Sequence, residues 1–339
     1  MDKKIFITGG AGYIGSHTCV EILKQNHQIM IFDSLINSSK EVFRRLELLT
    51  EKKIKFVIGD IRDQDRLTDA MQAFKPTSVI HFAGLKSVGE SFTKPFQYYD
   101  VNVTGALNVL QAMLQTGCKE IVFSSSASVY GSACMPPYVE TDFLDPISPY
   151  GHTKHTFETI LENFVNSEKD FRAVILRYFN PVGAHVSGLI GEDPNGIPNN
   201  LMPLISAVAQ KKIDYLSIYG DDYNTLDGTG ERDFIHVTDL AAGHVKAVEK
   251  IENLNKLQIL NLGTGKSTSV MALKQAFEKI NNVNIPIKLA ERRAGDVPKS
   301  QADPSLANKL IGFECKKTIE DMCADTWNWQ TKNPNGYKK

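Results

Sequence analysis

A glycine-rich turn between an apolar run and a helical pattern places the strongest constraint on how this chain folds. The run Lys4-Ile5-Phe6-Ile7-Thr8 predicts a strand, and residues 16–24 have a helical pattern. Between them stand Gly9, Gly12 and Gly15. This spacing lets a chain turn tightly, approach a diphosphate with its backbone, and pack a helix on a strand. The helix would also point the positive end of its dipole at a phosphate.

An aspartate ends the next predicted strand. Residues 28–32 form a second apolar run that leads into Asp33, about 20 residues beyond the glycines. A carboxylate there can bind both ribose hydroxyls of an adenosine and would repel a 2′-phosphate, so it favours NAD over NADP. The glycines alone would also suit a surface turn, but strand, helix and acid together favour a dinucleotide site.

Strand and helix patterns continue to alternate. Apolar runs at 55–59, 78–82, 121–123 and 173–178 predict strands, and residues 95–115 predict a long helix. This alternation predicts an α/β fold, namely a Rossmann-type, doubly wound parallel sheet with helices on both faces. Ligands of such sheets lie beyond the carboxyl ends of the strands. Five polar or small residues fall at such ends: Gly9, Asp33, Asp60, Ala83 and Ser126.

The candidate catalytic residues follow the 121–123 strand. Ser126 is the last of three serines that follow this apolar strand. Further along, Ser148 and Pro149 predict the start of a helix. Tyr150 and Lys154 are four residues apart and so share a face of that helix. An ammonium beside a phenol lowers the phenol pKa, which would make Tyr150 an acid or base near neutral pH. Ser126 can offer its hydroxyl to the same reacting oxygen.

After about residue 180 the alternation loosens. We expect a Rossmann domain over residues 1–180, which also receives chain from about 233–263, and a smaller, mixed α/β substrate lobe over 181–339 that interleaves with it. Residues 185–200 resemble a binding loop, and the tail after about Lys332 looks loose. Arg232 and Arg293 are isolated cations that suit a second diphosphate, although surface ion pairs would also explain them.

Composition excludes several functional classes. The net charge is −1 and no block of basic residues is present, which argues against nucleic acid as a partner. No apolar run approaches ~18 residues, so we expect no membrane partner. The five cysteines are scattered along the chain and include no Cys-x-x-Cys motif, which fits reduced thiols in the cytoplasm. The His and Cys residues lack metal-site spacing, so we predict no metal.

Several motifs together resemble the extended short-chain dehydrogenase/reductase family, and within it the NAD-dependent sugar-nucleotide 4-epimerases. The match covers nearly the whole chain. Its motifs occupy residues 9–17, 81–86, 123–126, Tyr150-x-x-x-Lys154, 177–184, 199–203 and 227–233.

The resemblance implies an isomerase that inverts C4 of UDP-galactose and UDP-glucose through a 4-keto intermediate, with tightly bound NAD. Tyr150 would take the proton from the 4-hydroxyl, Ser126 would bond the same oxygen, and Lys154 would lower the Tyr150 pKa and hold the nicotinamide ribose. The family also implies a homodimer formed through the 97–116 and 150–167 helices. The residues that the resemblance places around NAD are Gly9, Gly12, Tyr13, Ile14, Gly15, Asp33, Ser34, Asn37, Ser38, Asp60, Ile61, Phe82, Ala83, Gly84, Lys86, Asn102, Ser124, Tyr150, Lys154 and Phe179. Those that it places around the UDP-sugar are Lys86, Ser126, Tyr150, Tyr178, Asn180, Asn199, Asn200, Leu201, Tyr219, Arg232, Arg293, Asp296 and Ser300.

One position departs from the family pattern. In well-known bacterial members the stretch equivalent to 295–300 ends in a tyrosine that narrows the sugar pocket, whereas here it ends in Ser300. A small residue leaves room for an N-acetyl group, so we expect UDP-GlcNAc and UDP-GalNAc to be substrates too.

Two alternatives remain open on the sequence. A 4,6-dehydratase of the same family would need a carboxyl group beside the strand-end hydroxyl, and none follows Ser126 until Glu140. A non-catalytic NAD-binding regulator could dispense with Ser126, Tyr150 and Lys154, which are all present.

Overall fold

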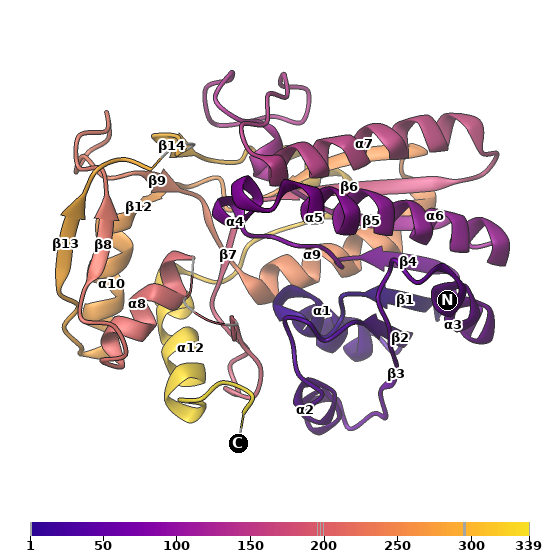
Figure 1. Cartoon of the computed structure of the whole chain (residues 1–339), viewed down its shortest axis with the longest axis horizontal. Coiled ribbons are helices and arrows are strands. Elements are labelled where there is room, and N and C mark those ends of the chain that lie inside the picture. The colour runs from indigo at the N-terminus through magenta and orange to yellow at the C-terminus, as the bar shows by residue number, and fades with distance from the viewer. Residues whose placement is uncertain (1, 195, 197, 199, 294–295, 339) are drawn as a thin grey trace.

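A single parallel sheet organises the N-terminal part of the protein (Figure 1). The computed structural model describes residues 2–338 except 195, 197, 199, 294 and 295. Seven strands lie in the order β11-β6-β5-β4-β1-β2-β3, and every neighbouring pair is parallel. These strands are β1 (Lys4–Thr8), β2 (Gln28–Asp33), β3 (Lys55–Ile58), β4 (Ser78–His81), β5 (Glu120–Ser126), β6 (Arg172–Tyr178) and β11 (Leu257–Leu262). The predicted doubly wound α/β fold is therefore confirmed.

Helices cover both faces of this sheet because its strands are apolar on both sides. On β1, Ile5 and Ile7 join one core cluster while Phe6 points into the other, as the two-residue period of a strand requires. The first cluster is closed by α1, α2 and α9, and the second by α3, α6 and α7. The bounds of these helices are α1 (Tyr13–Lys24), α2 (Glu41–Thr50), α3 (Gln64–Phe74), α6 (Gly105–Thr116), α7 (Pro149–Ser167) and α9 (Val237–Lys250).

The long helix predicted at 95–115 contains a break in its pattern. It consists of α5 (Pro95–Tyr99), a π-helical segment η1 (Asp100–Thr104) and α6, and a short helix α4 (Val88–Thr93) precedes it. Asn102 lies inside η1 and uses its amide to hold the backbone of Leu85. π-helical turns of this kind are frequent at functional sites.

Most of the remaining chain forms a second lobe around its own apolar cluster, whereas α11 (Ser305–Ile311) packs on β11 and α9 in the first cluster. The chain changes sheets at Asp233, since the strand before it pairs with residues 268–269 and 299–300 and the strand after it pairs with residues 180–182. The Asp233 carboxylate accepts from the backbone N–H groups of Thr264 and Gly265 at 2.8 and 3.0 Å. The other elements of this part are β7 (Asn180–Val182), α8 (Leu201–Ala209), β8 (Leu216–Tyr219), β9 (Glu231–Arg232), β10 (Phe234–His236), β12 (Thr268–Ser269), α10 (Val270–Asn281), β13 (Ile287–Ala290), β14 (Lys299–Ser300) and α12 (Ile319–Lys332).

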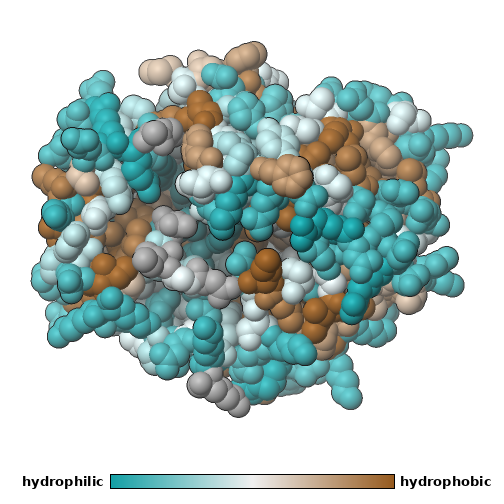
Figure 2. Space-filling model, viewed as in Figure 1, coloured by the Kyte–Doolittle hydropathy of each residue, from teal (hydrophilic) through white to brown (hydrophobic). Residues whose placement is uncertain are grey.

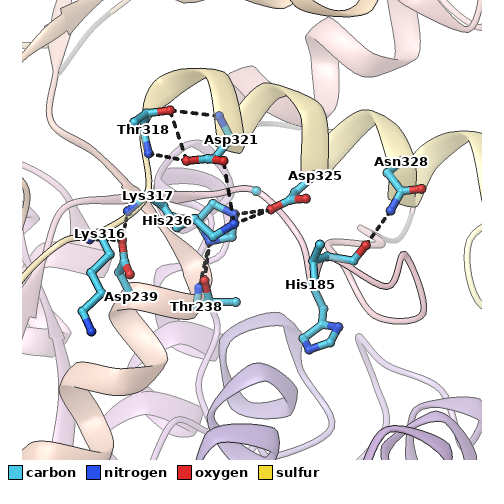
Figure 3. Close-up of polar contacts among 12 residues, drawn as sticks. His185, His236, Thr238, Asp239, Lys316, Lys317, Thr318, Asp321, Asp325 and Asn328 are labelled. Atoms are coloured by element: carbon cyan, nitrogen blue, oxygen red, sulfur yellow. Dashed lines mark hydrogen bonds and ion pairs between the residues drawn. The ribbon is translucent and has the colours of Figure 1, made fainter.

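Helix α12 is anchored at its start and along its inner face. Thr318 and Asp321 form a capping box at its N-terminus. Figure 3 shows Asp325, one turn further on, facing His236, and their side chains are 3.2 Å apart. The tail beyond α12 was expected to be loose, but this is wrong up to Lys338, because Tyr337 is buried against Trp329.

Polar side chains cover much of the face seen in Figure 2, and apolar ones gather in separate patches. Among residues 2–338, outside the gaps given above, no helix is both long and apolar enough to cross a bilayer.

Candidate active site

The glycine turn forms a cradle at the start of α1. The helix begins at Tyr13, earlier than the pattern predicted, with Gly12 as a cap that has no side-chain hydrogen bond. The first N–H groups of α1 therefore have no capping side chain and suit a phosphate. A Cβ on Gly15 would lie 2.3 Å from the Gly9 carbonyl oxygen, and one on Gly9 would lie 2.6 Å from the Ala83 nitrogen. The backbone packing thus requires glycine at both positions, and the cradle fits the diphosphate of a dinucleotide.

Asp33 lies at the carboxyl end of β2, beside this cradle. Its Oδ2 accepts from the Ala11 N–H at 2.9 Å, and its Oδ1 accepts from Leu35 N at 2.8 Å and Ser38 Oγ at 3.2 Å. Burial raises the pKa of Asp33, and these hydrogen bonds oppose that rise. Each carboxylate oxygen has two lone pairs, so Oδ1 is fully engaged while Oδ2 keeps one lone pair that can accept from a ribose hydroxyl. Ser34, on the same loop, is exposed, as is Asn37.

Asp60 and Ile61 follow β3 at the same edge. Asp60 is paired with Arg62 at 2.7 Å, and Arg62 is also paired with Asp100 at 2.7 Å. The hydrogen bonds and the charge of Arg62 lower the pKa of Asp60, so it is a carboxylate at neutral pH. Ile61 is buried, and its carbonyl accepts from Asn108 at 3.1 Å.

The turn after β4 brings residues 82–86 against α7. Asn102 Oδ1 accepts from Leu85 N at 2.7 Å, and its Nδ2 donates to Leu85 O at 3.0 Å and Thr153 Oγ1 at 3.1 Å. A Cβ on Gly84 would lie 3.0 Å from Asn102 Oδ1 and 3.9 Å from Lys154 Nζ. Asn102 therefore holds the loop that reaches the candidate catalytic helix. Phe82 packs against the ring of His244 at 4.7 Å.

Ser126, Tyr150 and Lys154 meet at the carboxyl end of β5. Ser148 caps α7 by accepting from Gly151 N at 3.1 Å, and Pro149 is its first residue, as predicted. Lys154 Nζ donates to the Ser124 carbonyl at 2.8 Å and lies 5.8 Å from the centre of the Tyr150 ring.

The expected lowering of the Tyr150 pKa is not what this structure produces. Burial raises the Tyr150 pKa, and a hydrogen bond with Ser126 only partly opposes the rise. The Lys154 ammonium is engaged with the Ser124 carbonyl, and burial lowers its own pKa to about 8. Both groups are desolvated, and desolvation disfavours the charged form of each.

A buried polar network beneath these residues was missed in the sequence. Arg177 of β6 and Glu158 of α7 form an ion pair at 2.6 Å with side-chain exposures of 2% and 5%. Ser125 Oγ donates to the same carboxylate, and Tyr178, next to Arg177, bonds the hydroxyl of Ser124. Glu158 lies four residues after Lys154 on the same helix, so these two residues form a second charged pair at helical spacing. That spacing could have indicated that Glu158 lies on the same face as the candidate catalytic residues.

The two predicted arginines converge on one carboxylate in the second lobe. Asp296 is 3.5 Å from Arg232 Nη2 and 3.0 Å from Arg293 Nε. Arg232 is largely desolvated, which lowers its pKa, whereas Arg293 is half-exposed over the ring of Tyr219 at 4.8 Å. Ser300 pairs with Arg232 across β14 and β9, so it lies in the same small sheet.

The other predicted substrate residues occupy varied settings. Lys86 pairs with Glu192 at 2.8 Å, and Asn200 donates to the same oxygen at 3.1 Å. Asn180 is exposed on β7, while Phe179 is buried against Tyr138. Leu201 packs on the second-lobe cluster, and Asn199 lies outside the described residues. Glu192 was not foreseen, because a lone acid in a glycine-rich stretch gives no periodic signal.

The described part of the chain contains no group of three or more His, Cys, Asp or Glu side chains placed to hold a metal ion. Its five cysteines are all free thiols.

Comparison with known proteins supplies the family. The model of the NAD-dependent epimerase/dehydratase family matches residues 5–263. The UDP-glucose 4-epimerase of Haemophilus influenzae is 51% identical over 98% of this chain and 99% of its own, and that of Bacillus subtilis is 49% identical over 98% of each. A crystal structure of UDP-glucose 4-epimerase from Stenotrophomonas maltophila, with bound NAD and formylated UDP-arabinopyranose, is 46% identical. It superposes with a TM-score of 0.96 over 98% of this chain and 99% of that chain. With the glycine cradle, the Asp33 strand end and the Ser126-Tyr150-Lys154 cluster, these matches show that the chain belongs to the NAD-dependent epimerase/dehydratase family.

Proposed function

We propose that this protein interconverts UDP-galactose and UDP-glucose by inverting C4 of the hexose. The observation that carries the proposal is the meeting of Ser126, Tyr150 and Lys154 at the sheet edge that also bears the glycine cradle and Asp33. The two named epimerases that are about half identical over nearly the full length support it.

Tyr150 is the proposed acid and base. As phenolate it accepts the proton of the 4-hydroxyl, and as phenol it returns that proton to the 4-keto oxygen, while Ser126 donates to the same oxygen. Bound NAD supplies hydride acceptance from C4 and hydride return to it. Because burial raises the Tyr150 pKa, an additional positive charge beside the ring is needed to favour the phenolate. Lys154 Nζ already lies 5.8 Å from the ring centre and does not offset the rise, so the additional charge would be that of an oxidised nicotinamide.

The residues implied above for NAD remain our proposal for the cofactor site. Gly9, Gly12 and Gly15 would admit the diphosphate, and Asp33 would accept from the adenosine ribose. The domain division is likewise proposed, with residues 1–180 and about 233–263 for NAD and the rest of 181–339 for the UDP-sugar.

Arg232 and Arg293 are proposed to bind the UDP diphosphate. The single carboxylate of Asp296 offsets only one of their two positive charges, so the cluster keeps a net positive charge, and guanidinium groups bind phosphate oxygens bidentately. A firm hold on UDP with a loose hold on the hexose would let the 4-keto sugar present its other face, which inversion requires.

The dehydratase alternative is less well supported. The carboxylates near the carboxyl end of β5 are engaged elsewhere, because Glu158 pairs with Arg177 at 2.6 Å and Glu140 Oε1 accepts from the backbone N–H of Asn261 on β11 at 2.7 Å. A non-catalytic regulator would not need Ser126, Tyr150 and Lys154 to lie together at the end of β5.

An N-acetylated substrate is part of the proposal because Ser300, rather than a tyrosine, stands beside Arg232. The Ser300→Tyr variant should retain activity on UDP-galactose and lose it on UDP-GalNAc.

The test is a coupled assay of purified protein without added NAD, on UDP-galactose and separately on UDP-GalNAc. Formation of the gluco epimer from both would support the epimerase, resident NAD and the open pocket. Activity on UDP-galactose alone would show that the pocket beside Ser300 does not accept an N-acetyl group. Formation of a keto-deoxy sugar would identify the protein as a dehydratase.

A homodimer in the cytoplasm, without nucleic-acid or membrane partners, completes the proposal. The faces of α5 and α6 expose Phe96 (85%), Leu107 (43%) and Leu114 (47%), which suits a helix-bundle interface. Light scattering of the purified protein should give twice the chain mass. The free thiols fit a reducing compartment, and cell fractionation checks the location.

A further inference from the structure

Glu192 joins two segments that the proposed substrate site draws on. Its Oε1 lies 2.8 Å from Lys86 Nζ, after β4, and accepts from Asn200 Nδ2, at the start of α8, at 3.1 Å. The Glu192 side chain is 9% exposed, while that of Lys86 is 58% exposed. A buried carboxylate therefore restrains a flexible, solvent-facing ammonium.

The backbone around Glu192 is held by α12. Figure 3 shows Asn328 on this helix reaching the loop that contains His185. The donors are side chains of α12 or the residue after it, and the bonds are Asn328 to Val186 O (2.8 Å), Lys332 to Ser187 O (3.0 Å), Asn333 to Gly188 O (2.8 Å) and Trp329 to Glu192 O (3.1 Å). Carbonyl groups of this irregular segment, 186–192, thus find donors on the C-terminal helix.

The C-terminal tail contacts the same segment. The Tyr337 hydroxyl bonds both the N–H and the carbonyl of Gly191 at 3.2 Å. A Cβ on Gly191 would lie 2.4 Å from Trp329 Cγ, so the approach depends on glycine. Arg45 of α2 donates to Leu189 O at 2.8 Å with its guanidinium 4.9 Å from the Tyr337 ring centre. The main chain that leads up to Glu192, and its own carbonyl, are therefore held by contacts from distant parts of the sequence.

We propose that Glu192 is a positioning residue for binding of the nucleotide-sugar, because it orients the Lys86 ammonium and the Asn200 amide. In this proposal α12 and Tyr337 fix the position of Glu192 by holding the backbone beside it. The inference rests on the proposed function, since it assigns Lys86 and Asn200 to the UDP-sugar. Its effect falls on binding more than on chemistry, because the two partners of Glu192 are proposed for binding and not for proton transfer.

The test compares Glu192→Ala, Glu192→Gln and Tyr337→Phe with the wild type, by calorimetric titration with UDP and by KM and kcat for UDP-galactose. Glu192→Ala should raise both the UDP Kd and the KM about 10-fold. Its kcat should change by less than about 2-fold. Glu192→Gln keeps an acceptor for both partners and should fall between Ala and wild type, and Tyr337→Phe should shift Kd and KM about 3-fold in the same direction. Glu249→Ala is the control, since it removes a carboxylate paired only loosely with His27 at 3.4 Å.

Unchanged Kd and KM in Glu192→Ala, or a lower kcat with unchanged KM, would overturn the inference while wild-type activity stands. A lower melting temperature with unchanged Kd would also overturn it, since Glu192 would then serve stability alone. If Glu192→Ala does not fold, Glu192→Gln and Tyr337→Phe decide by the same criterion. Wild-type protein that binds no UDP would instead overturn the proposed function together with this inference.

Discussion

Arg177→Met should lower the free energy of unfolding by about 3–5 kcal/mol, because it leaves the Glu158 carboxylate buried without its cation. The two side chains are 2.6 Å apart and are 2% and 5% exposed, so water cannot replace the lost partner. The guanidinium also donates to Tyr130 Oη at 3.2 Å and to Glu140 O at 3.1 Å, and both acceptors lose that donor.

The loss can be converted into a melting temperature. For 339 residues, an unfolding entropy of about 2.1 cal/mol/K per residue gives about 0.7 kcal/mol/K. The midpoint should therefore fall by about 4–7 °C. Urea unfolding followed by circular dichroism would measure the free energy itself.

A double variant separates the buried charge from packing. Arg177→Met combined with Glu158→Leu removes both charges, so it should be more stable than Arg177→Met alone. The control is Arg44→Met, which breaks a surface pair whose arginine is 53% exposed and should cost less than about 1 kcal/mol. The reasoning is refuted if Arg177→Met costs no more than the control, or if the two substitutions in the ion pair are additive.

Three further outcomes are expected. Tyr150→Phe should reduce kcat by about 10²–10⁴-fold in the coupled assay with an unchanged circular dichroism spectrum, because it removes the proposed proton acceptor. Gly15→Ala places a Cβ 2.3 Å from the Gly9 carbonyl, so the purified variant should release less NAD on denaturation than Gly89→Ala, whose Cβ meets nothing within 4 Å. Burial lowers the pKa of Lys154 from 10.5 to about 8, so between these values the unfolded chain binds a proton that the native protein has released. The stability of wild type relative to Lys154→Met should therefore rise from pH 8 to pH 9.5, and a flat difference in urea unfolding would contradict the shift.

Local patterns were sufficient for much of the candidate site. The glycine turn, Asp33 and the Ser148-Pro149 helix start depend on neighbours within a few residues, and each appears at the predicted place. Because parallel strands bring their carboxyl ends to one edge, even the grouping of Gly9 with Ala83 follows from alternation along the chain.

Other features depend on partners far apart in sequence. Arg232 and Arg293 were recognised as isolated cations, but their convergence on Asp296 arises from the folding of the second lobe. The chain passes from one sheet to another at Asp233, whose carboxylate binds the backbone of residues 264–265. The periodicity of apolar residues predicts local secondary structure and cannot predict contacts between residues that are far apart in the sequence.

Short-range geometry specifies the parallel sheet, the edge proposed for the dinucleotide and the Tyr150-Lys154 pair on one helix face, so all three can be predicted from the amino-acid sequence. The upward shift of the Tyr150 pKa and the contacts of Glu192 with Lys86 and Asn200 arise only in the folded chain. Desolvation and long-range hydrogen bonding depend on which distant segments exclude water from a group, and those segments meet only after the chain has folded.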